Sequence, residues 1–367
     1  MFTNQNKLSN HLFFMRLALF QARKNLGNTK ENPSVGCIIT KNNLVISAGC
    51  TGINGRPHAE HNAIVYSRKN LKDSQMYVTL EPCSHHAITS PCIEKIIKKR
   101  LKRVFFSVSD PDLRSYKKSK SLLNKENISV NKGVYQNEVK NFYRSYFKSK
   151  KSPLPFVTCK LAISKDHFTI VKKNKWITNN YSRARAHLIR SYHDCIITSS
   201  KTIIADNSRL TCRIDGLNNR SPSRIILDNK LNIPLKSNII KEASKYRTII
   251  FYNKFNKKKI AQLKKLRVKL FKISRDENNN LDLHKVLVKA KSLGFYRILV
   301  ESGMKLINNF LNKNLIDDFN LFISNKKLEK RGKAKITNDL KLFLMKKKSY
   351  IEKVNLFGEK LIIYKIK

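Results

Sequence analysis

Acidic residues are scarce in this chain of 367 residues: 25 Asp and Glu stand against 75 Lys and Arg, a formal net charge of +50. This balance excludes an acidic disordered tail, and it raises the question of nucleic acid, because basic surfaces bind phosphates. The excess is spread along the chain, however, with +17 in residues 1–150 and +33 in 151–367. It comes mainly from 55 Lys beside 38 Asn, a skew typical of AT-rich coding sequences. We therefore expect a solvated basic surface and no nucleic-acid partner.

Long apolar runs are also missing. No stretch reaches the roughly 18 apolar residues that a membrane span needs, so we expect no membrane association. The apolar segment 13–20 is short, contains Arg16 and lacks a small-residue cleavage site, which argues against a secretory signal. The seven cysteines are an odd number and do not indicate a disulfide framework. Together these absences predict a cytoplasmic protein.

The length favours two domains, and a hydrophobic content of 41% is enough for each domain to form a hydrophobic core. The first part alternates helix-like and strand-like patterns, and Lys41-Asn42-Asn43 joins two of the strands as a hairpin. We predict helices at 12–26, 59–67 and 93–99, and strands at 35–40, 44–48, 76–80 and 104–108. Strands that alternate with helices indicate an α/β layer structure.

The second part repeats this alternation after a polar stretch, 148–155, that ends in Pro153-Leu154-Pro155 and predicts a domain boundary. We assign residues 1–150 to one domain and 151–367 to another. The predicted strands are 156–163, 195–198, 224–227, 247–252, 297–300, 318–323 and 361–364. The predicted helices are 180–191, 258–266, 283–293 and 304–314.

The most specific signal is a set of metal-ligating residues between 57 and 92. His58 opens a predicted helix, Cys83 follows a predicted strand, and Cys92 starts the next helix. One imidazole and two thiolates are three protein ligands, and zinc sites of this kind keep a fourth position for water. Glu60 lies two residues from His58, where its carboxylate could move a proton without binding the metal. The pattern H-x-E followed by P-C…C is that of zinc nucleobase deaminases, although here eight residues, not two, separate the cysteines.

Several nearby residues have weaker claims. A buried histidine and two core thiols would be the structural alternative for the cluster, but the order of the ligands and the Pro before each Cys argue against it. His85 and His86 lie between the two cysteines, and for them we favour substrate contact or loop exposure over a ligand role. Cys37 and Cys50, at the hairpin, fit small core residues.

The motifs around this cluster resemble one family. They are the segment 32–37 (Asn-Pro-Ser-Val-Gly-Cys), His-Ala-Glu at 58–60, and the long segment 79–92 that holds both cysteines. This set resembles the deaminase half of the bifunctional riboflavin-biosynthesis deaminase/reductase family, whose long inter-cysteine loop separates it from tRNA adenosine and cytidine deaminases. The resemblance implies zinc on His58, Cys83 and Cys92, with Glu60 as the proton shuttle.

The second half resembles the reductase of the same family over residues up to about 325. The matching segments are 156–164, 176–178, 198–202, 206–213, 224–228 and 300–303. The resemblance implies a dihydrofolate-reductase-like α/β domain that uses NADPH, which explains the absence of a G-x-G-x-x-G motif, and it also suggests a homo-oligomer. It assigns cofactor binding to Ala162, Trp176, Thr202, Asp206, Asn229, Gly303, Met304 and Lys305. It assigns substrate binding to Asn174, Arg190, Leu210, Arg213 and Glu301.

The chemistry of the side chains and the backbone supports three of these assignments. Gly303 after a strand and before a helix allows close backbone approach at a helix N-terminus, which suits phosphate. Arg190 and Arg213 suit a phosphate because a planar guanidinium binds it through two N–H groups. Without the resemblance, solvated arginines would be the simpler interpretation, and core packing would be the simpler one for Trp176.

The sequence also departs from the family pattern. His167 stands where the family has Gly, and Asn207-Ser208 replaces Asp-Pro. In the deaminase part, Thr51 replaces a histidine and Ile88 a basic residue, so an imidazole and a charge that could anchor substrate are missing.

The resemblance implies an N-terminal cytidine-deaminase-like α/β/α domain that deaminates a diaminopyrimidinone carrying a phosphoribosylamino group. The C-terminal reductase domain would then reduce the ribosyl chain of the product with NADPH. The alternatives are a nucleic-acid (tRNA) base deaminase and a drifted homologue that retains only one of the two activities.

Overall fold

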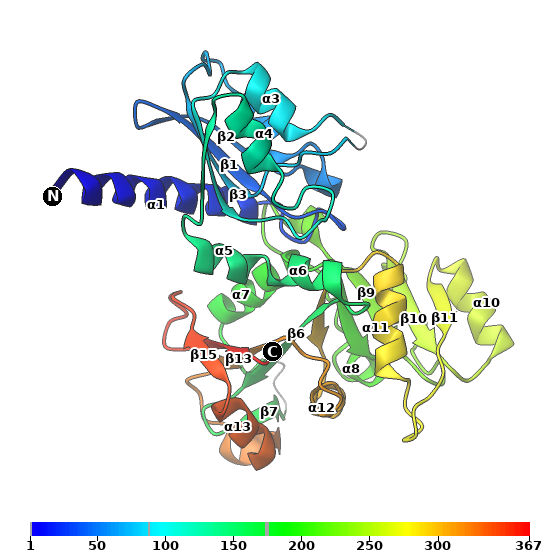
Figure 1. Cartoon of the computed structure of the whole chain (residues 1–367). Coiled ribbons are helices and arrows are strands. Elements are labelled where there is room, and N and C mark those ends of the chain that lie inside the picture. Colours follow the sequence, from blue (N-terminus) through cyan, green and yellow to red (C-terminus); the bar gives the residue numbers. More distant parts are fainter. Residues whose placement is uncertain (1, 87–88, 173–175) are drawn as a thin grey trace. The chain divides into compact units, whose positions relative to one another are not determined.

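The computed structural model describes residues 2–86, 89–172 and 176–367. It divides into two compact units, Met1–Ser152 and Pro153–Lys367 (Figure 1). The polar stretch 148–155, which we predict as a boundary, begins inside the last helix of the first unit. The two-domain α/β fold class is confirmed.

The first unit contains one five-stranded sheet in the order β2-β1-β3-β4-β5. The hairpin is antiparallel, as predicted, and both residues of its turn, Asn42 and Asn43, have positive φ; Asn tolerates this conformation well. β3, β4 and β5 run parallel. The elements are α1 (Phe2–Arg23), β1 (Gly36–Lys41), β2 (Leu44–Cys50), η1 (Ile53–Gly55), α2 (Ala59–Val65), β3 (Gln75–Leu80), α3 (Cys92–Lys98), β4 (Arg103–Val108), α4 (Ser119–Lys125), β5 (Ser129–Lys132), α5 (Gln136–Phe142) and α6 (Arg144–Lys151).

Helices cover both faces of this sheet, because successive strand residues point to opposite sides. Ile38, Tyr77 and Phe105 pack under α1 on one face. Their chain neighbours on the same strands face α2 and α3 together with other core residues. The result is the expected α/β/α arrangement, and it sets the N-termini of α2 and α3 near the carboxyl end of β3.

The second unit is built on a nine-stranded sheet in the order β11-β10-β9-β8-β12-β6-β13-β16-β15. The first seven are parallel, and β16 and β15 extend the sheet antiparallel. A separate ribbon pairs β14 with β7. The elements are β6 (Phe156–Ile163), β7 (Phe168–Val171), α7 (Asn180–Ser191), β8 (Cys195–Ser199), α8 (Ser200–Asp206), η2 (Asn218–Arg220), β9 (Ser223–Leu227), α9 (Asn238–Lys241), β10 (Thr248–Tyr252), α10 (Lys257–Lys265), β11 (Lys269–Lys272), α11 (Leu283–Ser292), β12 (Arg297–Glu301), α12 (Met304–Asn312), β13 (Asp318–Ile323), η3 (Glu329–Arg331), β14 (Gly332–Lys335), α13 (Asn338–Met345), β15 (Lys348–Ile351) and β16 (Lys360–Lys365).

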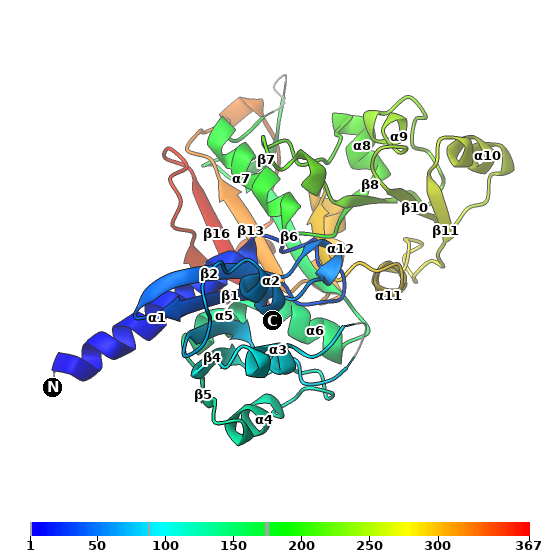
Figure 2. The ribbon, with the colours of Figure 1, turned by 90° about the horizontal axis from the view of Figure 1, so that it is seen from above.

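The parallel strands of this unit read as unbroken apolar runs because both of their faces are covered. In β8, Ile196 packs against the helices α7 to α10, whereas Ile197 belongs to the core under α11, α12 and α13. Figure 2 shows α8 and α9 on one side of the sheet and α11 and α12 on the other. Helices therefore cover both faces of these parallel strands.

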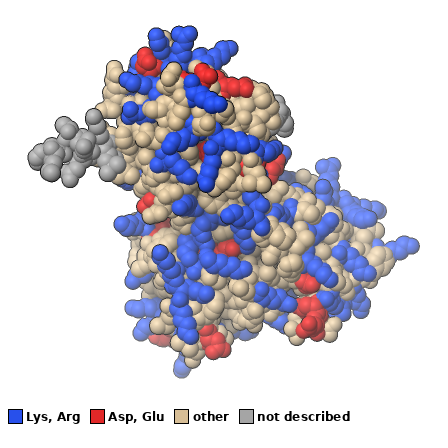
Figure 3. All heavy atoms as spheres, viewed as in Figure 1, with Lys and Arg blue, Asp and Glu red and all other residues tan. Residues whose placement is uncertain are grey.

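Basic side chains are scattered over the visible faces of both units in Figure 3, with few acidic ones between them. This distribution matches the even spread of charge along the sequence. None of the helices in the described ranges combines the length and the apolar character that a membrane crossing requires.

Candidate functional site

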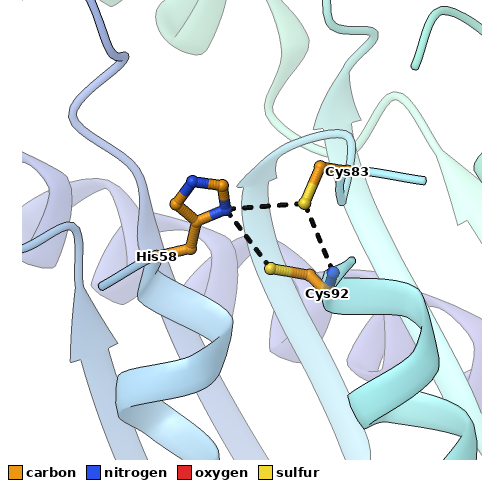
Figure 4. Close-up of side chains that lie close together, drawn as sticks. All are labelled: His58, Cys83 and Cys92. Atoms are coloured by element: carbon orange, nitrogen blue, oxygen red, sulfur yellow. Dashed lines mark hydrogen bonds between the residues drawn. The ribbon is translucent and has the colours of Figure 1, made fainter. Parts of the chain in front are cut away.

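His58, Cys83 and Cys92 come together in the first unit (Figure 4). His58 is the N-cap of α2, Cys83 follows β3, and Cys92 is the first residue of α3. The Nδ1 atom of His58 lies 3.5 Å from Sγ of Cys83 and 3.4 Å from Sγ of Cys92. The backbone N–H of Cys92 donates to Sγ of Cys83 at 3.3 Å.

These separations fit a tetrahedral zinc ion. Typical zinc–sulfur and zinc–nitrogen bonds at the tetrahedral angle place the nitrogen and sulfur ligand atoms about 3.6 Å apart. The three ligand atoms lie within 4.8 Å of one another. A three-residue set of one imidazole and two thiols leaves a fourth position, which is the arrangement of catalytic and not of closed structural zinc sites.

The cluster is electrostatically coupled. The hydrogen bond to Cys83 is the main cause that raises the pKa of His58, and the nearby charge of Arg56 acts in the opposite direction. The hydrogen bond between the two thiols lowers the pKa of Cys83 to about 4 and raises that of Cys92. One thiol thus already has thiolate character, the form that binds metal.

Glu60 lies beside this cluster and is buried, with 4% of its surface exposed. Burial raises the pKa of Glu60 to about 7, and the charge of His58 and a hydrogen bond with Cys92 act against that rise. A carboxyl group with a pKa near neutrality can both accept and release a proton.

A second layer of polar contacts holds the loops that carry the ligands. The carboxylate of buried Glu81 accepts from the hydroxyl of Ser119 at 3.0 Å. Nδ1 of His85 lies 2.7 Å from Oγ of Ser115, which also accepts from the backbone N–H of Ser84. Nε2 of His86 instead lies 2.8 Å from a carboxylate oxygen of exposed Glu94.

The departures in the deaminase part have different structural outcomes. Thr51 is buried, and its Oγ1 accepts from the backbone N–H of Val35 at 2.8 Å, so this position supports the hairpin. Ile88 lies outside the described residues. Arg56, which no sequence motif indicates, donates from Nη1 to Oγ1 of Thr89 at 2.8 Å.

In the second unit, Thr202, Asn229 and Gly303 follow the carboxyl ends of β8, β9 and β12. β12 lies between β6 and β8. After β8 the chain continues to β9 on one side of this pair of strands, and after β12 it continues to β13 on the other side. This is a topological switch point, where ligands of open α/β sheets bind outside the carboxyl ends of the strands.

Two helix N-termini meet at that edge. Oγ1 of Thr202, in α8, lies 2.9 Å from Oγ of Ser302 and accepts from the backbone N–H of Gly303 at 3.4 Å. Oγ of Ser199 lies 3.0 Å from the same Thr202 oxygen. Gly303 is exposed, and a Cβ added to it would meet no atom within 4 Å. This open backbone at the start of α12 suits a phosphate group of a dinucleotide.

Arg190 of α7 forms a buried ion pair with Glu301 at the end of β12. Its Nε and Nη2 donate to the two carboxylate oxygens at 2.7 and 2.9 Å, and its Nη1 donates to the backbone oxygen of Thr211 at 2.9 Å. Burial alone would raise the pKa of Glu301, but Arg190 lowers it to about 2. Arg190 therefore presents its guanidinium to Glu301, although the sequence analysis assigns it to the substrate phosphate.

His187, one helical turn before Arg190, links this pair to Arg213. Its Nδ1 lies 2.9 Å from the backbone oxygen of Thr211, and its Nε2 lies 3.1 Å from Nη2 of Arg213. Burial and the two guanidinium groups lower the pKa of His187 to about 4, so the ring is neutral at pH 7 and Nε2 can accept from Arg213. No sequence motif indicates His187, although its spacing of three from Arg190 places both residues on one face of α7.

The other predicted residues of the reductase site differ in exposure. Ala162 lies on β6 and Asp206 at the exposed end of α8. Trp176 is 51% exposed with the guanidinium of Arg183 over its ring, so it is not a core residue. Asn229 follows β9, and its Nδ2 donates to the backbone oxygen of Asn279. Leu210 is buried and has φ of 55°. Met304 is partly buried and Lys305 is exposed. Asn174 lies outside the described residues.

The fold and the first site define the class of the protein: an α/β enzyme that joins a zinc-dependent deaminase domain to a second, nucleotide-binding α/β domain. Family models agree with this division. Residues 8–108 match the cytidine and deoxycytidylate deaminase zinc-binding region, and residues 155–350 match the RibD C-terminal domain.

Whole-chain relatives specify the family. The chain is 31% identical to riboflavin biosynthesis protein RibD of Actinobacillus pleuropneumoniae, over 88% of this chain and 86% of that protein. It is 30% identical to RibD of Aquifex aeolicus, over 96% and 97%. Among solved structures, Acinetobacter baumannii RibD matches with a TM-score of 0.81 at 25% identity, covering 98% and 99% of the two chains. A Thermotoga maritima protein, described as a diaminohydroxyphosphoribosylaminopyrimidine deaminase/5-amino-6-(5-phosphoribosylamino)uracil reductase, matches with a TM-score of 0.81 at 27% identity over the same shares.

The chain belongs to the RibD family of riboflavin biosynthesis. It is therefore a bifunctional enzyme with a zinc-dependent deaminase domain and an NADPH-dependent reductase domain, and the family, fold, function and cofactors predicted from the sequence are confirmed.

Proposed function

We propose that His58, Cys83 and Cys92 hold the zinc ion and that Glu60 is the proton shuttle of the deaminase. The ligand separations of 3.4 and 3.5 Å, close to the tetrahedral value of about 3.6 Å, are the observation that carries this assignment. A zinc ion in such a site supplies an activated water. The position of Glu60 against the ligand cluster supports its role.

In the deamination, the carboxylate of Glu60 takes one proton and delivers it to the departing amine. Its pKa of about 7 suits both halves of this transfer at neutral pH. The substrate is a small phosphorylated pyrimidine, 2,5-diamino-6-(5-phosphoribosylamino)pyrimidin-4(3H)-one, and ammonia leaves from its ring.

The second domain then reduces the ribosyl chain of the deaminated product to a ribityl chain, with NADPH as the source of hydride. Thr202, Gly303, Met304 and Lys305 would hold the dinucleotide at the meeting helix N-termini. The further cofactor contacts are Ala162, Trp176, Asp206 and Asn229. The substrate contacts are Asn174, Leu210, Arg213, Glu301 and Arg190.

Within that substrate set, Arg190 and Arg213 have different roles. Arg190 fixes the carboxylate of Glu301 through two hydrogen bonds. Arg213 is exposed and is oriented by neutral His187, so its guanidinium is the one available for the substrate phosphate.

The test is to incubate the zinc-loaded full chain with the diaminopyrimidinone ribosyl phosphate and NADPH while ammonia and NADPH absorbance are followed together. Release of ammonia with oxidation of NADPH is expected. Ammonia alone would identify a homologue that retains only the deaminase. If neither signal appears, the proposed reactions are wrong, and a salt-dependent gel shift with tRNA would then examine a nucleic-acid substrate.

A homo-oligomeric state and a cytoplasmic location stay predictions.

A further inference from the structure

Arg56 occupies a distinctive place at the deaminase site. It lies in the loop that precedes α2, two residues before the ligand His58. Its Nη1 donates to Oγ1 of Thr89 at 2.8 Å, and Thr89 lies three residues before the ligand Cys92. The side chain of Arg56 therefore spans the two loops that deliver zinc ligands to the cluster.

The other cations near the ligands are placed differently. Lys95 lies one turn into α3, and its Nζ is 2.8 Å from Nδ1 of His61, one turn into α2. Arg114 holds the carboxylate of Asp112 through two hydrogen bonds. Lys95 therefore lies within α3 and Arg114 lies in an ion pair, whereas Arg56 precedes the N-terminus of α2.

The contact with Thr89 uses only one of the N–H groups of the Arg56 guanidinium. Of its five N–H groups, one is used by Thr89, and the part of the chain that the structure describes offers no partner to the others. No carboxylate among the described residues pairs with it, so its charge is uncompensated. A planar guanidinium in this state is suited to a phosphate, which it binds through two parallel hydrogen bonds.

We propose that Arg56 binds the phosphate of the pyrimidine substrate in the deaminase site and makes the deaminase selective for the phosphorylated compound. This inference rests on the proposed function, which supplies a phosphorylated substrate. Where the family has a basic residue in this domain, the chain has Ile88. Arg56 is a positively charged group of the same domain that can bind the phosphate instead. The contact to Thr89 then orients the guanidinium, and the phosphate takes the free N–H groups.

The experiment measures ammonia release by the zinc-loaded full chain without NADPH, so that only the deaminase is followed. Arg56→Gln is compared with the unaltered chain on the phosphorylated substrate and on the same compound without its phosphate. Loss of a charged hydrogen-bonded pair should raise KM for the phosphorylated substrate by about 10- to 100-fold. For the dephosphorylated compound KM should change by less than about twofold, and kcat and zinc content should stay near those of the unaltered chain.

Two further variants separate phosphate binding from loop support. Thr89→Val removes the contact but keeps the charge, so it should retain most of the preference for the phosphorylated substrate, and Arg56→Lys should recover part of it. Arg68→Gln removes one exposed charge from the same domain and should leave KM unchanged. The inference is overturned if Arg56→Gln raises KM equally for both compounds, leaves both unchanged, or is reproduced by Thr89→Val. An unaltered chain that releases no ammonia from either compound would instead refute the proposed function itself.

Discussion

The buried ion pair between Arg190 and Glu301 gives a quantitative prediction for the reductase domain. Side-chain exposure is 12% for Arg190 and 9% for Glu301, so water screens the pair little. The pKa of Glu301 lies at about 2 in the folded chain against an ordinary 4.5. Since a tenfold change in proton affinity corresponds to about 1.4 kcal/mol, the ionised carboxylate contributes about 3 kcal/mol to the free energy of unfolding at neutral pH.

We therefore expect Glu301→Gln to lower the free energy of unfolding of this domain by about 3 kcal/mol at pH 7, because Arg190 then stays buried without a counter-charge. The folded-state pKa is depressed, so the stabilisation is present above pH 4.5 and is lost as the pH falls towards 2. The difference between the variant and the unaltered chain should shrink over that range.

Urea unfolding followed by tryptophan fluorescence measures this effect, because the single Trp176 belongs to the second unit. Exposed Glu277→Gln is the matched control and should change the free energy by less than about 0.5 kcal/mol. The double variant Arg190→Met with Glu301→Met should stay close to the unaltered chain, since replacing a whole buried pair is tolerated better than breaking it. A cost below about 1 kcal/mol for Glu301→Gln, or a cost that does not fall between pH 4.5 and 2, would refute the reasoning.

Four other changes test the two sites. Glu60→Gln should keep zinc in the chain but slow ammonia release by about 10²- to 10⁴-fold; metal analysis and kinetics check this, and unchanged kinetics would refute the shuttle. Cys83→Ser should lose zinc and ammonia release while NADPH oxidation with the deaminated product continues; full zinc content would remove Cys83 from the ligand set. His167→Gly should raise the free energy of unfolding by about 1 kcal/mol, because His167 has φ of 71° and a buried Nδ1 without a partner among the described residues; a less stable variant would contradict this. The pKa of His187 falls from 6.5 to about 4 in the fold, so its contribution to stability is lost as the pH falls from 6.5 to 4, and His187→Gln should flatten the stability profile there; an unchanged profile in urea titrations would refute it.

Exposed and short elements show why part of the fold could not be predicted. The strand 156–163 and the helix 180–191 were expected with the bounds that the structure has, because long buried periodic patterns are strong signals. β7, β11, β14 and β15 have four residues each and are partly or fully exposed. Their pairing depends on neighbouring strands and not on their own pattern.

The departures from the family pattern were visible in the sequence, but their consequences were not. Asn207 ends α8 in the left-handed conformation, and its side chain accepts from the backbone N–H of Asn238; it is therefore a suitable helix cap in place of Asp. His167 keeps the left-handed backbone at a position where the family has Gly. Only the backbone angles distinguish a tolerated replacement from a strained one.

His58, Cys83, Cys92 and Glu60 are recognisable as candidates from the amino-acid sequence alone, because metal binding requires fixed residue types at short spacings. The order of the two domains and the family are recognisable from the motifs of each half. The tertiary structure decided which charges act together. Arg190 and Glu301 are 111 residues apart in sequence, and Arg56 meets Thr89 across 33 residues. Such pairs form only when strands and loops distant in the chain are brought side by side, and in a chain with 75 basic residues composition cannot tell which guanidinium is paired and which is free.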